Sequence, residues 1–281
     1  MTDLEQDHAG RAAPVEAWDA IAALYDEHVA PGEVDVAAAG LRLAGVRAGD
    51  GFLDVAAGTG GLGLPAARLG ARVLATDWSP RMIERFEARA RAEGLDAEGR
   101  VMDCHALDLR DDTYDVTGSQ FGVMLVPDQP RALREMVRVT RPGGRVLVIA
   151  YGDPAGFEAF QFFLGAVRAA VPGFAGPAAD EPMLEFQVAD PHVLHRRLVG
   201  AGLRDVTVAT DQQERITVRS GRELWDWTIG GNPAPGMIVA DLTPEQRAEI
   251  VRVLDRMVGE RSGRGCSAVL TAPLTIGVGT K

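Results

Sequence analysis

The sequence predicts an α/β fold in which helices cover a doubly wound, mostly parallel sheet of seven strands. Two observations support this: short apolar segments alternate with helical segments up to Tyr151, and a glycine-rich turn joins the first apolar segment to the next helix. After Tyr151 the alternation ends. We therefore expect an N-terminal helical cap (1–45), a Rossmann-like core (46–152), and a third part (153–281) that completes the sheet and inserts helices as a substrate lid.

Composition and charge exclude several classes of function. The 281 residues carry 29 basic and 40 acidic side chains, a formal net charge of −11, and the basic residues are scattered. A nucleic-acid partner needs a basic surface, so we expect none. Two cysteines cannot build a disulfide framework, no apolar run is long enough to span a bilayer, and Met1–Gly10 lacks the segments of a secretory signal. We expect a cytoplasmic protein without a membrane partner, and leave a homo-oligomer open.

The first half of the chain indicates one helix followed by alternating strands and helices. Apolar residues from Val15 to Tyr25 recur at helical spacing and predict an amphipathic helix over 14–29. Further along, Ser79 is a good N-cap and Pro80 suits the first position of a helix. The expected strands are 51–56, 71–77, 100–103, 114–123 and 145–151, and the expected helices are 62–69, one that begins at Ser79, and 128–139.

The second half predicts further helices set between strands. Ser220 and Thr243 are each followed three residues later by Glu or Gln, the spacing of a capping box, which predicts two inserted helices. Two segments rich in Pro, Gly and Ala are expected to be loops. The other expected elements are helices over 157–171 and 190–200 and strands over 206–218 and 269–278, and the expected loops are 171–182 and 230–236.

The turn after the first strand predicts a nucleotide-like ligand. Gly58, Gly60 and Gly63 match the GxGxxG pattern, which lets a ligand approach bare backbone at the N-terminus of a helix. Asp77 ends the second strand, where an acid that binds a ribose is expected. These residues by themselves leave an NAD(P)-dependent oxidoreductase open.

Three further details favour a ligand that carries a positive charge. Asp54 lies inside the first apolar strand, and a buried carboxylate is costly unless a cation or several donors satisfy it, so an ammonium group would suit it. Asp103 ends the third expected strand and adds a second acid at the same edge of the sheet. The turn Arg141–Gly144 directly precedes the fifth strand.

With these features the chain resembles the class I S-adenosylmethionine (SAM) dependent methyltransferases, most closely the small-molecule branch of the ubiquinone and menaquinone C-methyltransferases. The resemblance covers about 51–151. It implies SAM as the cofactor and S-adenosylhomocysteine (SAH) as the product. Five segments carry it in order: Leu53–Gly60, Ala75–Asp77, Val101–Cys104, Tyr114–Asp115 and Arg141–Gly144.

The resemblance also implies how SAM is held at its methionine and ribose ends. The turn at Ala56, Gly58 and Gly60 would pass beneath the methionine part, and Asp54 would help to anchor its ammonium group. Asp77 would accept both ribose hydroxyls, because a carboxylate has two acceptor oxygens. Where the family often has glycine this chain has Ala56, and alanine makes a positive φ less favourable there.

At the adenine end, Asp103 would accept the amino hydrogen while the backbone amide of Cys104 donates to the ring. Trp78 would cover one face of the adenine. Ser119 and Gln120 end the fourth strand, close to the transferred methyl group in this family. The Ser119 backbone would then touch the methionine part, and Gln120 would orient an oxygen of the substrate.

Methyl transfer from a sulfonium needs alignment and exclusion of water, and it needs a base only if the acceptor must lose a proton. Tyr25 and His28 lie three residues apart and hence on one face of the first expected helix. We expect Tyr25 to lie over the cofactor and His28 to act as general base. No histidines and acids combine at convincing ligand spacing, so we expect no metal.

The sequence therefore predicts a SAM-dependent methyltransferase that acts on oxygen, nitrogen or carbon of a small apolar or aromatic metabolite. Of the 29 basic residues only Lys281 is a lysine, which is typical of GC-rich coding sequence, and by analogy this suggests natural-product metabolism. Two alternatives stay open. One is an NAD(P)-dependent oxidoreductase, and the other is a SAM-fold protein that binds without catalysis.

Overall fold

The computed structural model describes residues 13–174, 176, 183–263 and 265–281. The N-terminal segment considered above for a secretory signal, and much of the expected loop 171–182, lie outside these residues. The helices are α1 (Val15–Leu24), α2 (Glu33–Ala44), α3 (Gly63–Arg68), α4 (Pro80–Glu93), α5 (Gln129–Val139), α6 (Glu158–Ala170), α7 (Pro191–Gly200), α8 (Gly221–Gly231), α9 (Pro233–Ile238) and α10 (Pro244–Ser262). The strands are β1 (Gly51–Val55), β2 (Arg72–Asp77), β3 (Ala97–Val101), β4 (Tyr114–Gln120), β5 (Thr140–Tyr151), β6 (Arg204–Ala209), β7 (Gln213–Val218) and β8 (Ala268–Thr280).

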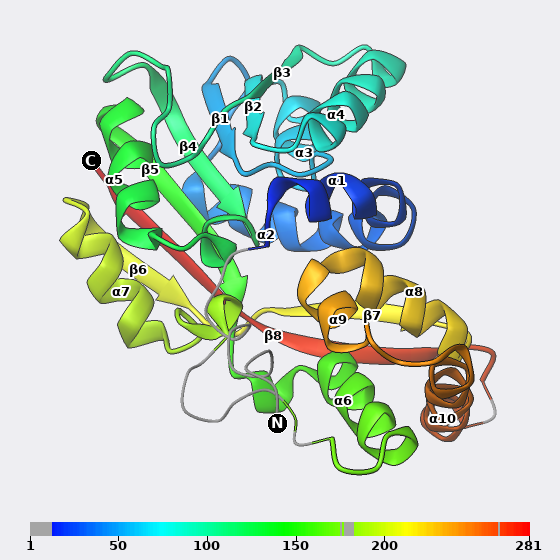
Figure 1. The fold of residues 1–281 in the computed structure, drawn as a ribbon. Helices are drawn as coiled ribbons and strands as arrows, with labels where there is room; N and C mark the ends of the chain where they lie inside the picture. The colour runs from blue at the N-terminus through cyan, green and yellow to red at the C-terminus, as the bar shows by residue number, and fades with distance from the viewer. Residues whose placement is uncertain (1–12, 175, 177–182, 264) are drawn as a thin grey trace.

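Strand order confirms the predicted doubly wound sheet and adds one strand to it. Seven strands lie in the order β3-β2-β1-β4-β5-β8-β6, and β7 also pairs with β8 (Figure 1). β8 is antiparallel to each of its partners, whereas β1 to β5 are parallel to one another. The 13 residues of β8 serve three partners, because Ala268–Pro273 pairs with β7 and Leu274–Thr280 lies between β5 and β6.

The order of the strands reverses next to β1, and this fixes where a ligand can bind. From β1 the chain passes to β2 and β3 on one side and then crosses to β4 and β5 on the other. In open α/β sheets the crevice for a ligand lies outside the carboxyl ends of the strands at such a reversal. The site is therefore expected where Val55 ends β1 and Gln120 ends β4.

The sheet is the centre of the main apolar core. Val146–Ala150 in β5 are all buried, as is usual for a strand that helices cover on both faces. Helices α2, α3, α4, α5 and α7 pack against the strands.

Side chains cap α4, α7, α8 and α10 at the residues that the sequence predicts. Ser79 accepts a hydrogen bond from the Met82 amide at 3.1 Å and begins α4. At α10 the predicted capping box is complete, because Thr243 and Gln246 each accept from the other's amide, at 3.2 and 2.9 Å. The box predicted at Ser220 is only half formed. Its hydroxyl caps α8, but the Glu223 carboxylate accepts from the amide of Arg219 instead.

Four element bounds differ from the prediction. The expected helix 14–29 ends as α-helix at Leu24 and continues as a π-helical turn, Tyr25–Val29. The expected strand 206–218 is two strands, since β6 and β7 pair with different parts of β8, and a continuous alternation of side chains cannot reveal that break. β3 ends at Val101, so Asp103 lies in the following loop. Finally, α8 and α9 occupy most of the expected loop 230–236, because Asn232 caps α9.

The inserted helices form a second apolar core. α6 packs against β8, α10 packs against α6 and α8, and α8 contacts α1 and the π-helical turn. Figure 1 shows α6 and α8–α10 grouped beyond the carboxyl ends of β4 and β5, where a substrate lid is expected. No helix in the described ranges has the length and apolarity needed to cross a bilayer. The part boundaries at 45/46 and 152/153 stay predictions.

Two helical glycines test how tightly this second core is packed. At Gly221 a Cβ atom would lie 2.1 Å from the backbone nitrogen of Asp255, so α8 and α10 must separate to accept it. We expect Gly221→Ala to lower the free energy of unfolding by about 1–3 kcal/mol. Gly259 in α10 has open space around it, so Gly259→Ala is the matched control and should raise stability by about 0.4–1 kcal/mol. Chemical denaturation measures both, and equal effects would contradict the close contact of α8 with α10.

Candidate functional site

A single cavity lies at the carboxyl ends of the strands and extends to the inserted helices. Its wall includes the glycine bend after β1, the tip of β2, the loop after β3 and the end of β4. The opposite wall is aromatic and comes from α1, β5, α6, α8 and the 3₁₀ turn Leu184–Phe186. The sheet reversal, the bend and the inserted helices thus meet at one place.

The bend has the left-handed backbone that a close approach requires. Gly58 has a φ of 54° and Gly60 a φ of 102°. Ala56 also has a positive φ, 52°, although alanine makes this conformation less favourable than glycine does. The hydrogen bond from the Ala57 amide to the Thr76 carbonyl, 3.0 Å, fastens the bend to β2 and helps to hold that conformation. Gly60 itself does not line the cavity, because Phe86 and Leu64 cover its Cα.

Asp54 is buried at the bend with only half of its carboxyl group satisfied. Its Oδ2 accepts from the Gly63 amide at 2.7 Å, while its Oδ1 has no partner among the described residues. Burial raises the pKa of Asp54 well above its usual range, and the acids Glu33 and Asp77 add to the rise. The sequence predicts that a cation or several donors satisfy Asp54. Among the described residues it has one donor, the Gly63 amide, so a cation can still pair with its other oxygen.

Asp77 builds the bend as well as facing the cavity. Its Oδ2 accepts from the Gly58 amide and its Oδ1 from the Ser79 amide, both at 2.9 Å. Burial raises its pKa to about 6 in spite of these bonds. Each carboxylate oxygen still has acceptor capacity for a ligand hydroxyl. That Asp77 also holds the bend was not predicted from the sequence.

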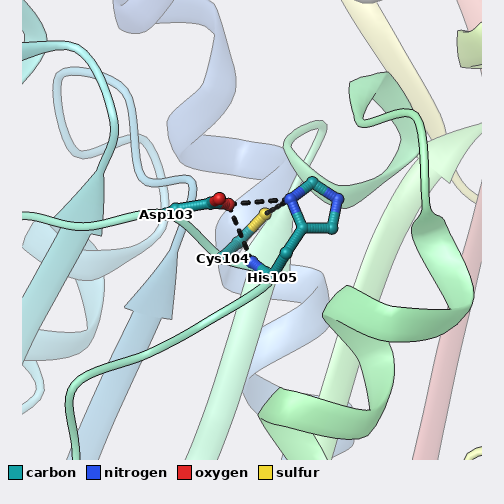
Figure 2. A group of neighbouring side chains, drawn as sticks. All are labelled: Asp103, Cys104 and His105. Atoms are coloured by element: carbon teal, nitrogen blue, oxygen red, sulfur yellow. Dashed lines mark hydrogen bonds and ion pairs between the residues drawn. The ribbon is translucent and has the colours of Figure 1, made fainter.

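Figure 2 shows Asp103, Cys104 and His105 on the loop after β3. Asp103 Oδ1 lies 2.7 Å from His105 Nδ1 and accepts from the His105 amide at 2.9 Å. Burial raises the pKa of Asp103, but these bonds outweigh it and the net pKa is lowered, so the acid is charged. Burial raises the pKa of the Cys104 thiol to about 12, which rules against a thiolate nucleophile.

The three side chains in Figure 2 also have ligand atoms of metal-binding type within 4.8 Å of one another. The ring nitrogen of His105 that faces the Cys104 sulfur already pairs with Asp103. We therefore assign no metal to this group, and the absence of a metal stays a prediction.

The two aromatic residues expected over the cofactor both line the cavity. Trp78 follows β2 and is 41% exposed, so one face of its ring is free to stack. The Tyr25 ring lies over the bend, 3.7 Å from where a Cβ of Gly58 would be. The Tyr25 hydroxyl donates to Glu33, and burial followed by the charge of Glu33 raises the tyrosine pKa well above 10.

His28 is not brought to the cavity. Its ring lies 3.9 Å from the Glu27 carboxylate, and it does not contribute to the cavity wall. The physical reason is the π-helical turn, which is wider than an α-helical turn and rotates His28 off the face that Tyr25 occupies. A spacing of three residues places two side chains on one face of an α-helix, and Tyr25–Val29 is not α-helical.

Ser119 and Gln120 also differ in position. Ser119 is fully buried away from the cavity, and its hydroxyl accepts from the Val123 amide at 3.1 Å. Gln120 lines the cavity, and its Nε2 donates to the Glu33 carbonyl at 3.3 Å. Its Oε1 is buried without a partner within the described part of the chain.

Sequence reasoning missed Glu33, which is 2% exposed and lies against the bend. A Cβ at Gly61 would be 2.0 Å from Glu33 Oε2, so glycine there makes room for the carboxyl group. Burial raises the pKa of Glu33 to about 7, although Tyr25 and Arg89 oppose the rise. An acid in the first turn of a helix is ordinary, and only the tertiary fold brings this one to the bend.

A second buried pair, Tyr151 and Glu214, was also missed. The Tyr151 hydroxyl donates to Glu214 at 3.0 Å, and burial followed by the charge of Glu33 raises the pKa of Glu214 to about 8. Tyr151 lines the cavity and stacks on Phe121 with ring centres 4.4 Å apart. Glu214 lies behind it on β7.

The hydrogen-bond acceptors in the cavity wall fit SAM. Among the described lining residues there is no Lys or Arg, whereas Glu33, Asp54 and Asp77 gather at the bend. The orphaned oxygens of Asp54 and Gln120 are acceptors, and an ammonium group offers three donors. A positively charged amino acid end is therefore the kind of ligand that satisfies this wall.

Comparisons with known proteins agree with this chemistry. Residues 52–144 match the family described as Methyltransferase domain. An uncharacterized protein of Mycobacterium tuberculosis is 44% identical over 131 residues, 46% of each chain. The ubiquinone/menaquinone biosynthesis C-methyltransferase UbiE of Bdellovibrio bacteriovorus is 38% identical over 116 residues, 40% of this chain and 49% of that protein. The chain thus spans about half the length of the curated relatives that it matches.

A solved structure extends the likeness of the fold beyond the matched domain. Phosphoethanolamine N-methyltransferase 2 of Haemonchus contortus, solved with SAM, aligns with a TM-score of 0.54 at 15% identity over 88% of this chain and 52% of its own. Residues 52–144 thus match a methyltransferase domain, and the findings support a class I, SAM-dependent methyltransferase. The domain is similar to the ubiquinone and menaquinone C-methyltransferases, and SAM is the cofactor that the findings support.

The buried acid at the bend makes a prediction about pH. The pKa of Glu33 in the folded protein, about 7, is above its ordinary 4.5, so its contribution to stability is complete below pH 4.5 and is lost as the pH rises through 7. At about 1.4 kcal/mol per pKa unit, the cofactor-free protein should lose roughly 3 kcal/mol through this group between pH 5 and pH 8.

Glu33→Gln keeps an acceptor for Tyr25 and removes the titration, so its free energy of unfolding should fall less over this range than that of the wild type. Urea denaturation at pH 5 and pH 8 measures the difference. Glu84→Gln, on the exposed face of α4, is the control and should follow the wild type. Parallel curves for Glu33→Gln and the wild type would show that Glu33 does not hold a proton at the bend.

Proposed function

We propose that this protein transfers the methyl group of SAM to oxygen, nitrogen or carbon of a small, largely apolar or aromatic metabolite. The observation that carries the proposal is the continuity of one cavity from the acids at the strand tips to the aromatic wall of the inserted helices. A cofactor held at the first end would direct its methyl group toward the second. SAM supplies the electrophilic methyl carbon.

Each residue at the strand tips has a proposed part in holding the cofactor. Asp54 and Glu33 receive the ammonium group beside the bend, and Tyr25 covers the bend from above. Asp77 accepts the ribose hydroxyls with the capacity left over from its two backbone bonds. Asp103 and the Cys104 amide meet the adenine, and Trp78 stacks on it.

The chain's contribution to the chemistry is alignment and exclusion of water. At the end of β4 and β5, Tyr151 stacks on Phe121 and lies tilted against Phe157, with ring centres 4.4 Å apart in both pairs. This apolar wall excludes water from the region between cofactor and acceptor. We assign no general base, because His28 lies outside the cavity wall.

Two further parts of the proposal, the metabolic role and the cellular location, rest on the sequence and not on the cavity. A role in natural-product metabolism is suggested by composition and analogy. A cytoplasmic location is suggested by the few cysteines.

The proposal is tested by binding first. Titration calorimetry with SAM should show near-stoichiometric binding, and Asp77→Ala should weaken it at least tenfold, because the ribose loses its acceptor and the Gly58 amide its partner. Asp50→Ala, at a half-buried position outside the cavity wall, is the control and should bind like the wild type. Equal binding by Asp77→Ala and the wild type would remove the ribose assignment.

The two alternatives have their own outcomes. In saturation-transfer NMR with SAM and NADH, we expect signals from SAM alone, and binding of NADH alone would replace the proposal with the oxidoreductase. Release of SAH in the presence of aromatic acceptors separates an enzyme from a protein that only binds SAM.

A further inference from the structure

Glu185 is an acid in the wall opposite the cofactor end, and the proposed function leaves it unused. It lies in the 3₁₀ turn Leu184–Phe186 and is 8% exposed, yet it contributes to the cavity wall. The Gln129 side chain donates to the Leu184 carbonyl at 3.2 Å and fixes the turn. A carboxyl group in such a wall is costly unless a partner satisfies it.

Asn232 supplies one such partner and leaves the second oxygen of Glu185 for a ligand. The Asn232 Oδ1 accepts from the Ala234 amide at 2.9 Å as the cap of α9, which turns its Nδ2 toward Glu185 Oε1 at 3.3 Å. The backbone amide of Glu185 is a second donor to this carboxyl group, and two donors still leave its oxygens with acceptor capacity for a ligand. Burial raises the pKa of Glu185, as expected for an acid without a cationic partner.

Four aromatic rings line the same cavity as this acid. Phe186 is the next residue, and its ring centre lies 5.5 Å from that of Phe160 and 6.5 Å from that of Phe157. Trp227 meets Phe157 edge to face at 6.2 Å. All four rings line the same cavity. Ring faces attract organic cations, and a carboxylate among them adds a charged acceptor.

The charge of the whole cavity points the same way. Five acids line it, Glu33, Asp54, Asp77, Asp103 and Glu185, and no Lys or Arg does so among the described residues. Four of them belong to the cofactor end. A ligand with a carboxylate or phosphate would meet repulsion and no basic side chain on the lid side.

We propose that the methyl acceptor carries a protonated amine, which Glu185 receives while Phe160, Phe186 and Trp227 enclose the apolar part of the molecule. This deepens the proposed function and rests on it. The amine is the group that holds the acceptor, and the methylated atom lies toward the bend. Glu185 thereby selects amines over neutral and acidic molecules of the same shape.

The test uses three probes of one shape: phenethylamine, 2-phenylethanol and 3-phenylpropionate. Calorimetry with the full chain, with and without saturating SAH, should show phenethylamine binding at least tenfold tighter than the alcohol and the acid not binding. Glu185→Gln keeps the shape and the bond from Asn232, and it should reduce phenethylamine binding at least tenfold while the alcohol changes less than twofold. Glu84→Gln, with the same change of net charge on the surface, should bind all three like the wild type.

A second variant guards against loss of folding. Asn232→Asp keeps the α9 cap and adds an acid beside Glu185, so it should bind phenethylamine at least as tightly as the wild type. Equal affinity for amine and alcohol in the wild type, or no effect of Glu185→Gln, would overturn the inference. If SAH fails to bind while the amine preference persists and depends on Glu185, the amine site stands and the methyltransferase proposal falls.

Discussion

The site depends on acids at the ends of parallel strands that accept hydrogen bonds from the backbone of the glycine bend. Asp77 holds the Gly58 amide and Asp54 the Gly63 amide, so β1 and β2 both grip the turn between β1 and α3. A left-handed backbone at Ala56 costs energy, and these bonds repay it by fixing the bend. The carboxyl groups that shape the turn are the same groups that face the ligand.

That arrangement has an electrostatic consequence. Burial raises the pKa of Glu33, Asp54 and Asp77, and the three acids stand close enough for their charges to add to the effect at Asp54. Without a ligand, protonation relieves the repulsion. A ligand with an ammonium and a sulfonium supplies the missing positive charge, which explains why such a wall suits SAM better than a dinucleotide with two phosphates.

The inserted segments line the aromatic part of the cavity. α6, α8 and the 3₁₀ turn Leu184–Phe186 bring aromatic rings and one buried acid to the cavity wall. In the proposed function, the acids at the strand tips hold the cofactor and the inserted segments contact the acceptor. The two halves are joined by Tyr25 and Tyr151, whose hydroxyls each meet a buried glutamate.

Sequence alone determined the sheet, the bend and the positions of the acids Asp54, Asp77 and Asp103 near strand ends, because apolar runs, glycine turns and strand ends are local patterns. It also determined the helix caps at Ser79 and Thr243. Only the tertiary structure decided that a π-helical turn directs His28 away, that Ser119 is buried outside the cavity, and that Glu33 and Glu185 join the site. Their positions depend on how segments far apart in the sequence pack together, and contacts of this kind produce no periodic pattern along the sequence.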